Sequence, residues 1–150
     1  MGDIKTDVSI LENHVFYMAK QLLLQYGEFL PFGAALTTDR QIVTIEYPGD
    51  EEYPEPELVV KYITKKLQHG AKTDEYLASA MAFDCRTIPP GSSHKMETVA
   101  INLDHNNYYS VVRLTPYQLR SGQLGLGPTF MQVGNYLIFP LDQAAQTGTE

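Results

Sequence analysis

Cysteine is almost missing from this sequence, and tryptophan is absent. Cys85 is the single cysteine among 150 residues, so the chain cannot close a disulfide within itself. A chain of this length can bury a sufficient core without disulfides or metals. Acceptor sites for N-glycosylation, Asn-x-Ser/Thr, are absent too. These absences exclude a disulfide scaffold and favour a cytoplasmic protein.

Long hydrophobic runs are also missing. A membrane-spanning helix needs about 20 consecutive apolar residues, and no run in the sequence approaches that length. The first residues, Met-Gly-Asp-Ile-Lys, lack the basic region followed by an apolar stretch that is typical of a signal peptide. We therefore expect a cytoplasmic location and no membrane partner.

Positive charge is scarce. Lys and Arg together number 11 against 18 Asp and Glu, which gives a formal net charge of −7. Proteins that bind nucleic acids gain much of their affinity from Lys and Arg contacts with phosphate. An acidic surface repels phosphates and anionic lipid headgroups. The charge therefore argues against nucleic acids and membranes as partners, and it suits a basic protein partner.

Catalytic and metal-binding patterns are absent as well. Cys85 is expected on an apolar strand face, where it is a small buried hydrophobe rather than a nucleophile activated by His94. The four histidines form no i, i+4 pair and no His-Glu-x-x-His motif. Asp104 and His105 adjoin a predicted hairpin turn, and turn chemistry favours a solvated turn over a metal site there. We expect no catalytic residue and no bound metal.

The glycine-rich stretch at residues 122–127, Gly-Gln-Leu-Gly-Leu-Gly, does not match a nucleotide-binding motif. A dinucleotide fingerprint follows a strand and opens a helix, whereas Pro128 follows here. The Gly-Lys-Ser/Thr end of a phosphate-binding P-loop is missing too. We therefore expect no cofactor, and we predict an irregular structural loop over residues 121–135.

Two stretches show the periodicity of helices that bury one face. Apolar residues recur at intervals of three and four in the first 26 residues, with Asp7 or Ser9 as the predicted N-terminal cap and Gly27 as the C-terminal one. A second amphipathic stretch begins near Pro56, which is favoured in the first turn of a helix, and is predicted to end at Gly70.

Two hairpins are predicted between and after the helices. Residues 32–37 and 42–47 favour strands and flank a short polar turn. Residues 99–103 and 108–114 alternate or cluster β-favouring side chains around an Asp-His-Asn-Asn turn. Pro116 is predicted to close the second hairpin.

Residues 76–88 admit two interpretations. The alanine content of residues 76–82 favours a helix. The alternation of alanine with larger side chains favours a strand with a closely packed alanine face. We predict a strand, because the segment that follows residue 82 is unsuited to a helix. A last short strand is predicted over residues 136–139.

These elements predict an α+β fold. The order is α-β-β-α-β-β-β-β, and an antiparallel sheet of about five or six strands with both helices on one face accommodates it best. Profilin-like modules share roughly this order, which is an analogy of topology alone. We predict a single domain over residues 1–150, with residues 1–3 and 142–150 frayed.

One segment also carries a resemblance. The run Glu-Phe-Leu-Pro-Phe-Gly at residues 28–33 ends a predicted helix and opens the first hairpin. This pattern, together with the later strand at residues 99–105, resembles small uncharacterised bacterial single-domain α+β proteins over about residues 10–140. The resemblance implies a shared fold and no established activity. Physically, Phe29 and Phe32 can seal the gap between helix and sheet, and Gly33 permits close backbone approach.

The densest charge cluster is an acidic, proline-containing segment before the second helix. Such runs usually form a solvated loop that favours a helix start. The functional alternative is a docking surface for a basic partner, with two tyrosines as aromatic anchors. The candidate binding residues are Tyr47, Asp50, Glu51, Glu52, Tyr53 and Glu55.

Three functional hypotheses follow from the sequence. The first is a non-enzymatic interaction protein, such as an accessory or immunity-type factor that neutralises a basic partner through this acidic surface. The second is a small-molecule binding module, or an enzyme of unrecognised type, with a pocket near the glycine-rich loop at residues 121–135. The third is a homodimeric scaffold joined through sheet or helix faces.

Overall fold

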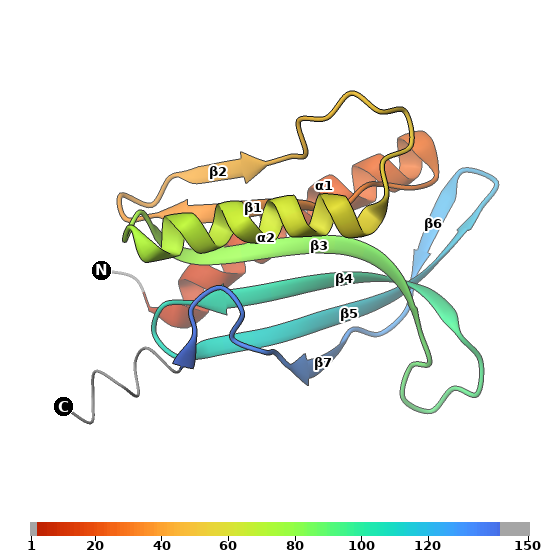
Figure 1. The fold of residues 1–150 in the computed structure, drawn as a ribbon. Coiled ribbons are helices and arrows are strands. Elements are labelled where there is room, and N and C mark those ends of the chain that lie inside the picture. The colour runs from red at the N-terminus through yellow and green to blue at the C-terminus, as the bar shows by residue number, and fades with distance from the viewer. Residues whose placement is uncertain (1–2, 142–150) are drawn as a thin grey trace.

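The computed structural model describes residues 3–141, which form two helices and seven strands. The order helix-strand-strand-helix followed by strands is as predicted, so the α+β class is confirmed (Figure 1), although five strands rather than four follow α2. The sheet has seven strands rather than five or six. The bounds are α1 Ile4–Tyr26, β1 Phe32–Thr37, β2 Ile42–Ile45, α2 Pro56–Lys72, β3 Tyr76–Thr87, β4 Met96–His105, β5 Tyr109–Arg120, β6 Gln123–Leu126 and β7 Phe130–Val133.

All strand pairings in the sheet are antiparallel. The strand order is β2-β1-β3-β4-β5-β6, and β7 pairs with β5 beside it. The long strands β3, β4 and β5 form the centre, and β2 is an edge strand that pairs with β1. Residues that face one another across this centre include Ser79, Asp104 and Ser110, which stand in one row.

The two helices lie on opposite faces of the sheet, so the prediction that both cover one face is wrong. Figure 1 shows α2 in front of the sheet and α1 behind it. Along β1, Ala34 and Leu36 belong to the core under α1, whereas Ala35 belongs to the core under α2. Successive strand residues point to opposite faces, so a continuous apolar run such as β1 needs cover on both sides.

Helix α1 packs against the alanine face predicted for the third strand. Ala78, Ala80 and Ala82 are fully buried in the α1 core, so the strand interpretation of residues 76–88 is confirmed. Small side chains let α1 approach the sheet closely. The helix contributes a buried stripe of Val8, Leu11, Val15, Ala19 and Leu23.

The ends of α1 are fixed by two caps. The Asp3 side chain accepts a hydrogen bond from the Thr6 backbone N–H at 2.7 Å, so the predicted caps Asp7 and Ser9 are wrong. Asp3 therefore belongs to the ordered helix start rather than to a frayed end. Gly27 ends the helix with φ of 79°, the left-handed conformation that glycine adopts without strain. That prediction is confirmed.

Close packing also fixes α2 against the sheet. A Cβ on Gly33 of β1 would lie 2.7 Å from Ile63 Cγ2, so glycine lets the helix approach as expected. Gly70 does not end the helix as predicted. It lies inside α2 and is buried against the Tyr76 ring, so its small size serves packing rather than termination.

The C-terminal third differs most from the prediction. β5 continues through Pro116 to Arg120 instead of closing there, because the Pro116 carbonyl still accepts a hydrogen bond, at 2.8 Å from the Gly127 N–H. Residues 121–135, predicted to be irregular, contain β6 and β7. Residues 136–139 form no strand.

Within residues 3–141, none of the helices is long and apolar enough to cross a membrane. The fraying predicted for residues 1–2 and 142–150 concerns residues outside those the structure describes.

Candidate functional site

A hollow of about 630 Å³ opens where the first hairpin meets the start of α2. Four segments that are distant in sequence form its walls: the end of α1 with the loop after it, the end of β2, the segment before α2, and β3. The lining residues are Leu22, Tyr26, Glu28, Phe29, Leu30, Pro31, Phe32, Glu46, Tyr47, Glu52, Tyr53, Pro54, Pro56 and Asp84. We call this hollow the acidic pocket.

The charged side chains that line the acidic pocket all carry carboxylates: Glu28, Glu46, Glu52 and Asp84. No Lys, Arg or His is among the lining residues. Each carboxylate comes from a different segment, so the fold gathers the charge more tightly than the sequence does. Carboxylates that share a concave surface create a negative potential that attracts cations.

Aromatic rings supply the rest of the pocket walls. Phe29 packs edge-on against Phe32 with ring centroids 5.9 Å apart, and Phe32 is buried in the α1 core. These two rings seal the gap between helix and sheet, as the sequence indicates. Tyr47 packs edge-on against Tyr62 of α2, also at 5.9 Å. Tyr53 is 82% exposed, so its ring is free to contact a ligand.

Asp84 is the most enclosed carboxylate of the pocket. It is half-buried on β3, and the Tyr117 hydroxyl lies 3.0 Å from each of its two carboxylate oxygens. Burial raises the pKa of Asp84, the bond from Tyr117 opposes that rise, and the negative charges of Glu97 and Glu28 add to it. Burial and the neighbouring Asp84 likewise raise the pKa of Tyr117, so this hydroxyl stays protonated and donates.

The Tyr47 ring is held in place by its hydroxyl. The Tyr47 hydroxyl donates a hydrogen bond to Glu51 Oε2 at 2.8 Å. That bond, with smaller effects of burial and of the negative charges on Glu51 and Asp50, raises the pKa of Tyr47. Glu51 therefore orients a pocket residue from outside the pocket.

The structure divides the six candidate binding residues into two groups. Tyr47, Glu52 and Tyr53 line the acidic pocket, whereas Asp50, Glu51 and Glu55 do not. Glu55 is the N-terminal cap residue of α2 and makes no side-chain capping bond.

Three of the four pocket carboxylates are absent from the binding residues predicted from the sequence: Glu28, Glu46 and Asp84. The one available signal was for Glu28, which opens the Glu-Phe-Leu-Pro-Phe-Gly run. Nothing local marks Glu46 or Asp84, because both become part of the pocket through strand pairing in the sheet.

The other chemical candidates do not assemble into reactive sites. Cys85 is half-buried, and burial together with Asp84 and Glu97 raises the pKa of its thiol, which opposes nucleophilic activation. His94 is exposed and contacts the Ser93 hydroxyl. No group of three or more potential metal ligands occurs among residues 3–141.

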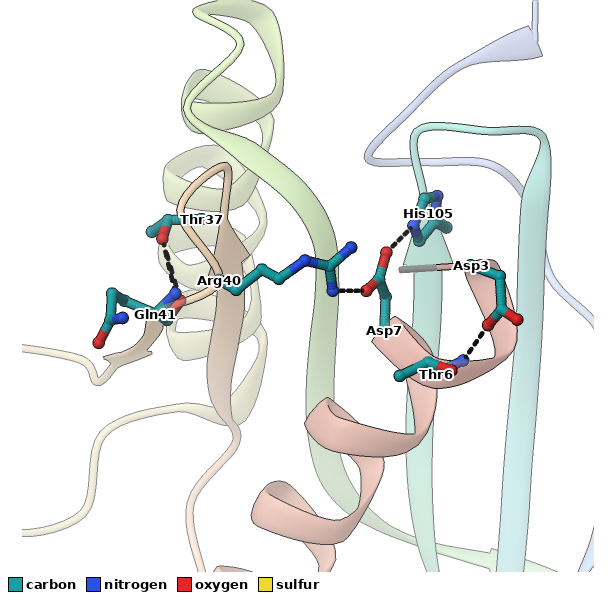
Figure 2. Close-up of polar contacts among 7 residues, drawn as sticks. All are labelled: Asp3, Thr6, Asp7, Thr37, Arg40, Gln41 and His105. Carbon is teal, nitrogen blue, oxygen red and sulfur yellow. Dashed lines mark hydrogen bonds and ion pairs between the residues drawn. The ribbon is translucent and has the colours of Figure 1, made fainter. Parts of the chain in front are cut away.

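Asp104 and His105 are buried, so the solvated turn predicted there is wrong. His105 faces α1, where its Nε2 lies 2.8 Å from Asp7 Oδ2, and Asp7 also pairs with Arg40 (Figure 2). The Asn107 backbone N–H donates to His105 Nδ1, so Nε2 carries the proton and donates to Asp7. With both ring nitrogens engaged, His105 anchors the helix to the end of β4.

The second hypothesis, a small-molecule binding module or an enzyme of unrecognised type with a pocket near residues 121–135, finds less support in the fold. Residues 121–135 form two short strands beside β5, and none of the three main hollows of the described residues is lined by them.

Among these arrangements, the acidic pocket is therefore the one best suited to bind a ligand. Rings and carboxylates together can hold a cationic side chain through cation–π contacts and charge-assisted hydrogen bonds. In comparisons with protein-family models, curated proteins and solved structures, nothing matches this chain.

Proposed function

We propose that this protein is a non-enzymatic interaction protein that binds a basic segment of a partner protein in the acidic pocket. One observation carries the proposal: the pocket joins four carboxylates from four segments to exposed aromatic rings and includes no basic side chain. A Lys or Arg side chain of the partner would complete this charge set.

The size and the exposed aromatic rings of the acidic pocket favour a protein partner over a free ion. The pocket volume of about 630 Å³ accommodates a long side chain with part of its backbone, and volumes of this order are typical of ligand sites. Tyr53 and Tyr26 are largely exposed at the pocket, and exposed tyrosines are frequent anchors of protein interfaces. The net charge of −7 would speed association with a basic partner.

Arginine is the side chain that the pocket suits best. Its planar guanidinium stacks on aromatic rings and binds carboxylates through two parallel bonds, whereas lysine is a more strongly hydrated point charge. We therefore expect arginine-containing segments to bind more tightly than lysine-containing ones of equal charge.

The test is a calorimetric titration of the whole protein with a short Arg-Gly peptide at low and at high salt. The double variant Glu28→Gln/Glu52→Gln should bind roughly tenfold more weakly, a loss of about 1.4 kcal/mol. The control Asp74→Asn/Glu75→Gln removes the same charge at the far end of α2, outside the acidic pocket, and should bind almost as tightly as the wild type.

Equal weakening by both double variants would mean that net charge alone attracts the peptide, and the acidic pocket would then be the wrong site. Absence of binding by the wild type at low salt would remove the proposal altogether. High salt should weaken the wild-type complex, because salt screens exposed charges.

A further inference from the structure

A second notable region lies on the α2 side of the sheet, away from the acidic pocket. Residues 134–140, which we call the strap, follow β7 and loop over the ends of β4 and β5 towards α2, as the dark-blue segment of Figure 1 shows. Ile138 of the strap is buried in the core beneath α2. The strap thereby closes the part of the sheet that α2 leaves uncovered.

A row of polar side chains lies beneath the strap. Ser79 of β3, Asp104 of β4 and Ser110 of β5 face one another in register. Asp104 is 4% exposed and Ser79 is 1% exposed. Among the described residues, Asp104 Oδ2 and Ser79 Oγ are the two buried side-chain oxygens that have no hydrogen-bond partner. Buried polar atoms without partners are costly and rare in folded proteins.

The strap is held down by few polar contacts, among them a bond from the Ile138 N–H to the Asp104 carboxyl. The Gly134 N–H donates to the Ser110 carbonyl at 3.0 Å, and the Tyr136 N–H donates to Ser110 Oγ at 3.1 Å. Gln68 Nε2 of α2 donates to the Leu137 carbonyl at 3.0 Å. Tyr136 has φ of 53°, a left-handed conformation that costs energy for a residue other than glycine.

Packing of the strap against α2 is also incomplete. A hollow of about 440 Å³ lies between strap residues 137–140 and the C-terminal end of α2. A segment with few bonds, one strained residue and an adjoining hollow is expected to open at low free energy.

We propose that the strap is a pH-sensitive cover, which the neutral form of Asp104 keeps closed and the ionised form releases. When the strap is closed, the Asp104 carboxyl is shielded from water. When it opens, the carboxyl meets water and releases its proton to the solvent. Ionisation is therefore favoured in the open state and opposed in the closed one.

The groups that face Asp104 leave it without a compensating positive charge. Its immediate neighbours are the Ser79 and Ser110 hydroxyls on the flanking strands and the Ile138 backbone of the strap. Burial raises the pKa of Asp104 to about 6, opposed by hydrogen bonds from Ser110 and the Ile138 N–H, and no charged side chain contributes to the shift. Lys72 and Asp74, at the C-terminal end of α2, line the adjoining hollow.

The direction of the pH response follows from linkage. The closed state holds the proton up to about pH 6, whereas an opened, hydrated carboxyl loses it near the ordinary aspartate pKa of 3.8. Raising the pH through this window therefore favours opening, and opening uncovers Ile138 and the apolar surface beneath α2. Between pH 5 and pH 7.5 the population of the open strap should rise about tenfold.

Amide hydrogen exchange of the full chain tests this proposal. The Gly134 and Tyr136 amides, which bond to Ser110, should lose about tenfold protection between pH 5 and pH 7.5 after correction for intrinsic exchange rates. Asp104→Asn keeps the shape of the side chain without a titrating group. In this variant the protection of both amides should be high and should not change with pH.

Asp74→Asn provides the matched control, because Asp74 lines the same hollow but is exposed. It should keep the wild-type response. Protection that stays constant with pH in the wild type would overturn the proposal. A pH response that persists in Asp104→Asn would also overturn it, since another group would then control the strap.

Discussion

Two buried aspartates, one on each face of the sheet, have opposite surroundings. Asp7 on the α1 side is 2% exposed and pairs with both Arg40 and His105 (Figure 2). Asp104 on the α2 side is 4% exposed, and its Oδ2 has no partner. Asp104 and His105 are adjacent on β4 but lie on opposite faces of the sheet. His105 pairs with the compensated carboxylate of Asp7 on one face, and Asp104 is the uncompensated carboxylate on the other.

The comparison shows that burial alone does not decide what a carboxylate does. Asp7 connects α1 to the turn after β1 and to the end of β4, two places that are far apart in sequence. A buried charge with such partners opposes any movement of the helix. Asp104 has hydroxyls and one backbone amide for neighbours, so its charge favours movement of the strap instead.

The largest effect is expected at Asp7. Asp7→Ala should destabilise the protein by about 3 kcal/mol, because it leaves His105 buried and Arg40 without its partner. Urea unfolding at pH 7 measures this loss. Asp39→Ala, an exposed aspartate on the same β1–β2 turn, should cost less than about 1 kcal/mol. Comparable losses in the two variants would show that Asp7 is not a structural anchor.

The next effect is expected at Asp104, with the opposite sign. Its raised pKa means that the folded state binds the proton more tightly than the unfolded state between 3.8 and about 6. Wild-type stability should therefore fall as the pH rises through this window and then level off. Asp104→Asn lacks this fall and should be more stable at pH 7.5 by up to about 3 kcal/mol.

Urea unfolding of the wild type and of Asp104→Asn across pH 3.5 to 7.5 measures that difference. The two stability curves should converge at the acidic end, where Asp104 is neutral in both states. Destabilisation by Asp104→Asn at pH 7.5 would show that the carboxylate has a stabilising partner, and the contrast with Asp7 would disappear.

Asp84 lies between these extremes, because it is half-buried and has one partner, Tyr117. Asp84→Asn should change the free energy of unfolding by less than about 1 kcal/mol. Loss of its charge from the acidic pocket should still weaken binding of the Arg-Gly peptide several-fold. Urea unfolding and peptide titration of the same variant separate these two effects. A large loss of stability would show that Asp84 is a structural anchor like Asp7.

The smallest effect is expected for a carboxylate on the surface. Glu97 pairs with Arg86 at 3.1 Å, and both side chains are largely exposed. Glu97→Gln should change stability by about 0–1 kcal/mol, since water and salt screen such pairs. Thermal unfolding at two salt concentrations checks this. A cost close to that of Asp7→Ala would contradict the ranking of carboxylates by burial and partners.

The sequence predicts the elements of this fold better than their arrangement. Both helices, the first hairpin and the strand at residues 76–87 are marked by local periodicity and by Gly27 or Pro56 at helix ends. The placement of the helices on opposite faces was within reach, because Phe32–Thr37 is an unbroken small and apolar run that requires cover on both sides.

The buried polar contacts and the acidic pocket were not predictable in the same way. Asp7 lies 33 residues from Arg40 and 98 residues from His105, and no local pattern connects them. The acidic segment at residues 50–57 attracts attention through its density of charge, yet only Glu52 of its carboxylates lines the pocket. Glu46 and Asp84 join it through strand pairing in the sheet, and Glu28 joins it from the loop between α1 and β1.

Binding of a basic segment in the acidic pocket can be tested by titrating isotope-labelled protein with the Arg-Gly peptide and monitoring the amide chemical shifts. We expect saturable shifts that are largest at the pocket residues Glu28, Phe29, Tyr47 and Tyr53 and that are reduced in Glu28→Gln/Glu52→Gln. Shifts that centre on the C-terminal end of α2, or that spread over all acidic residues without saturating, would contradict binding in the acidic pocket.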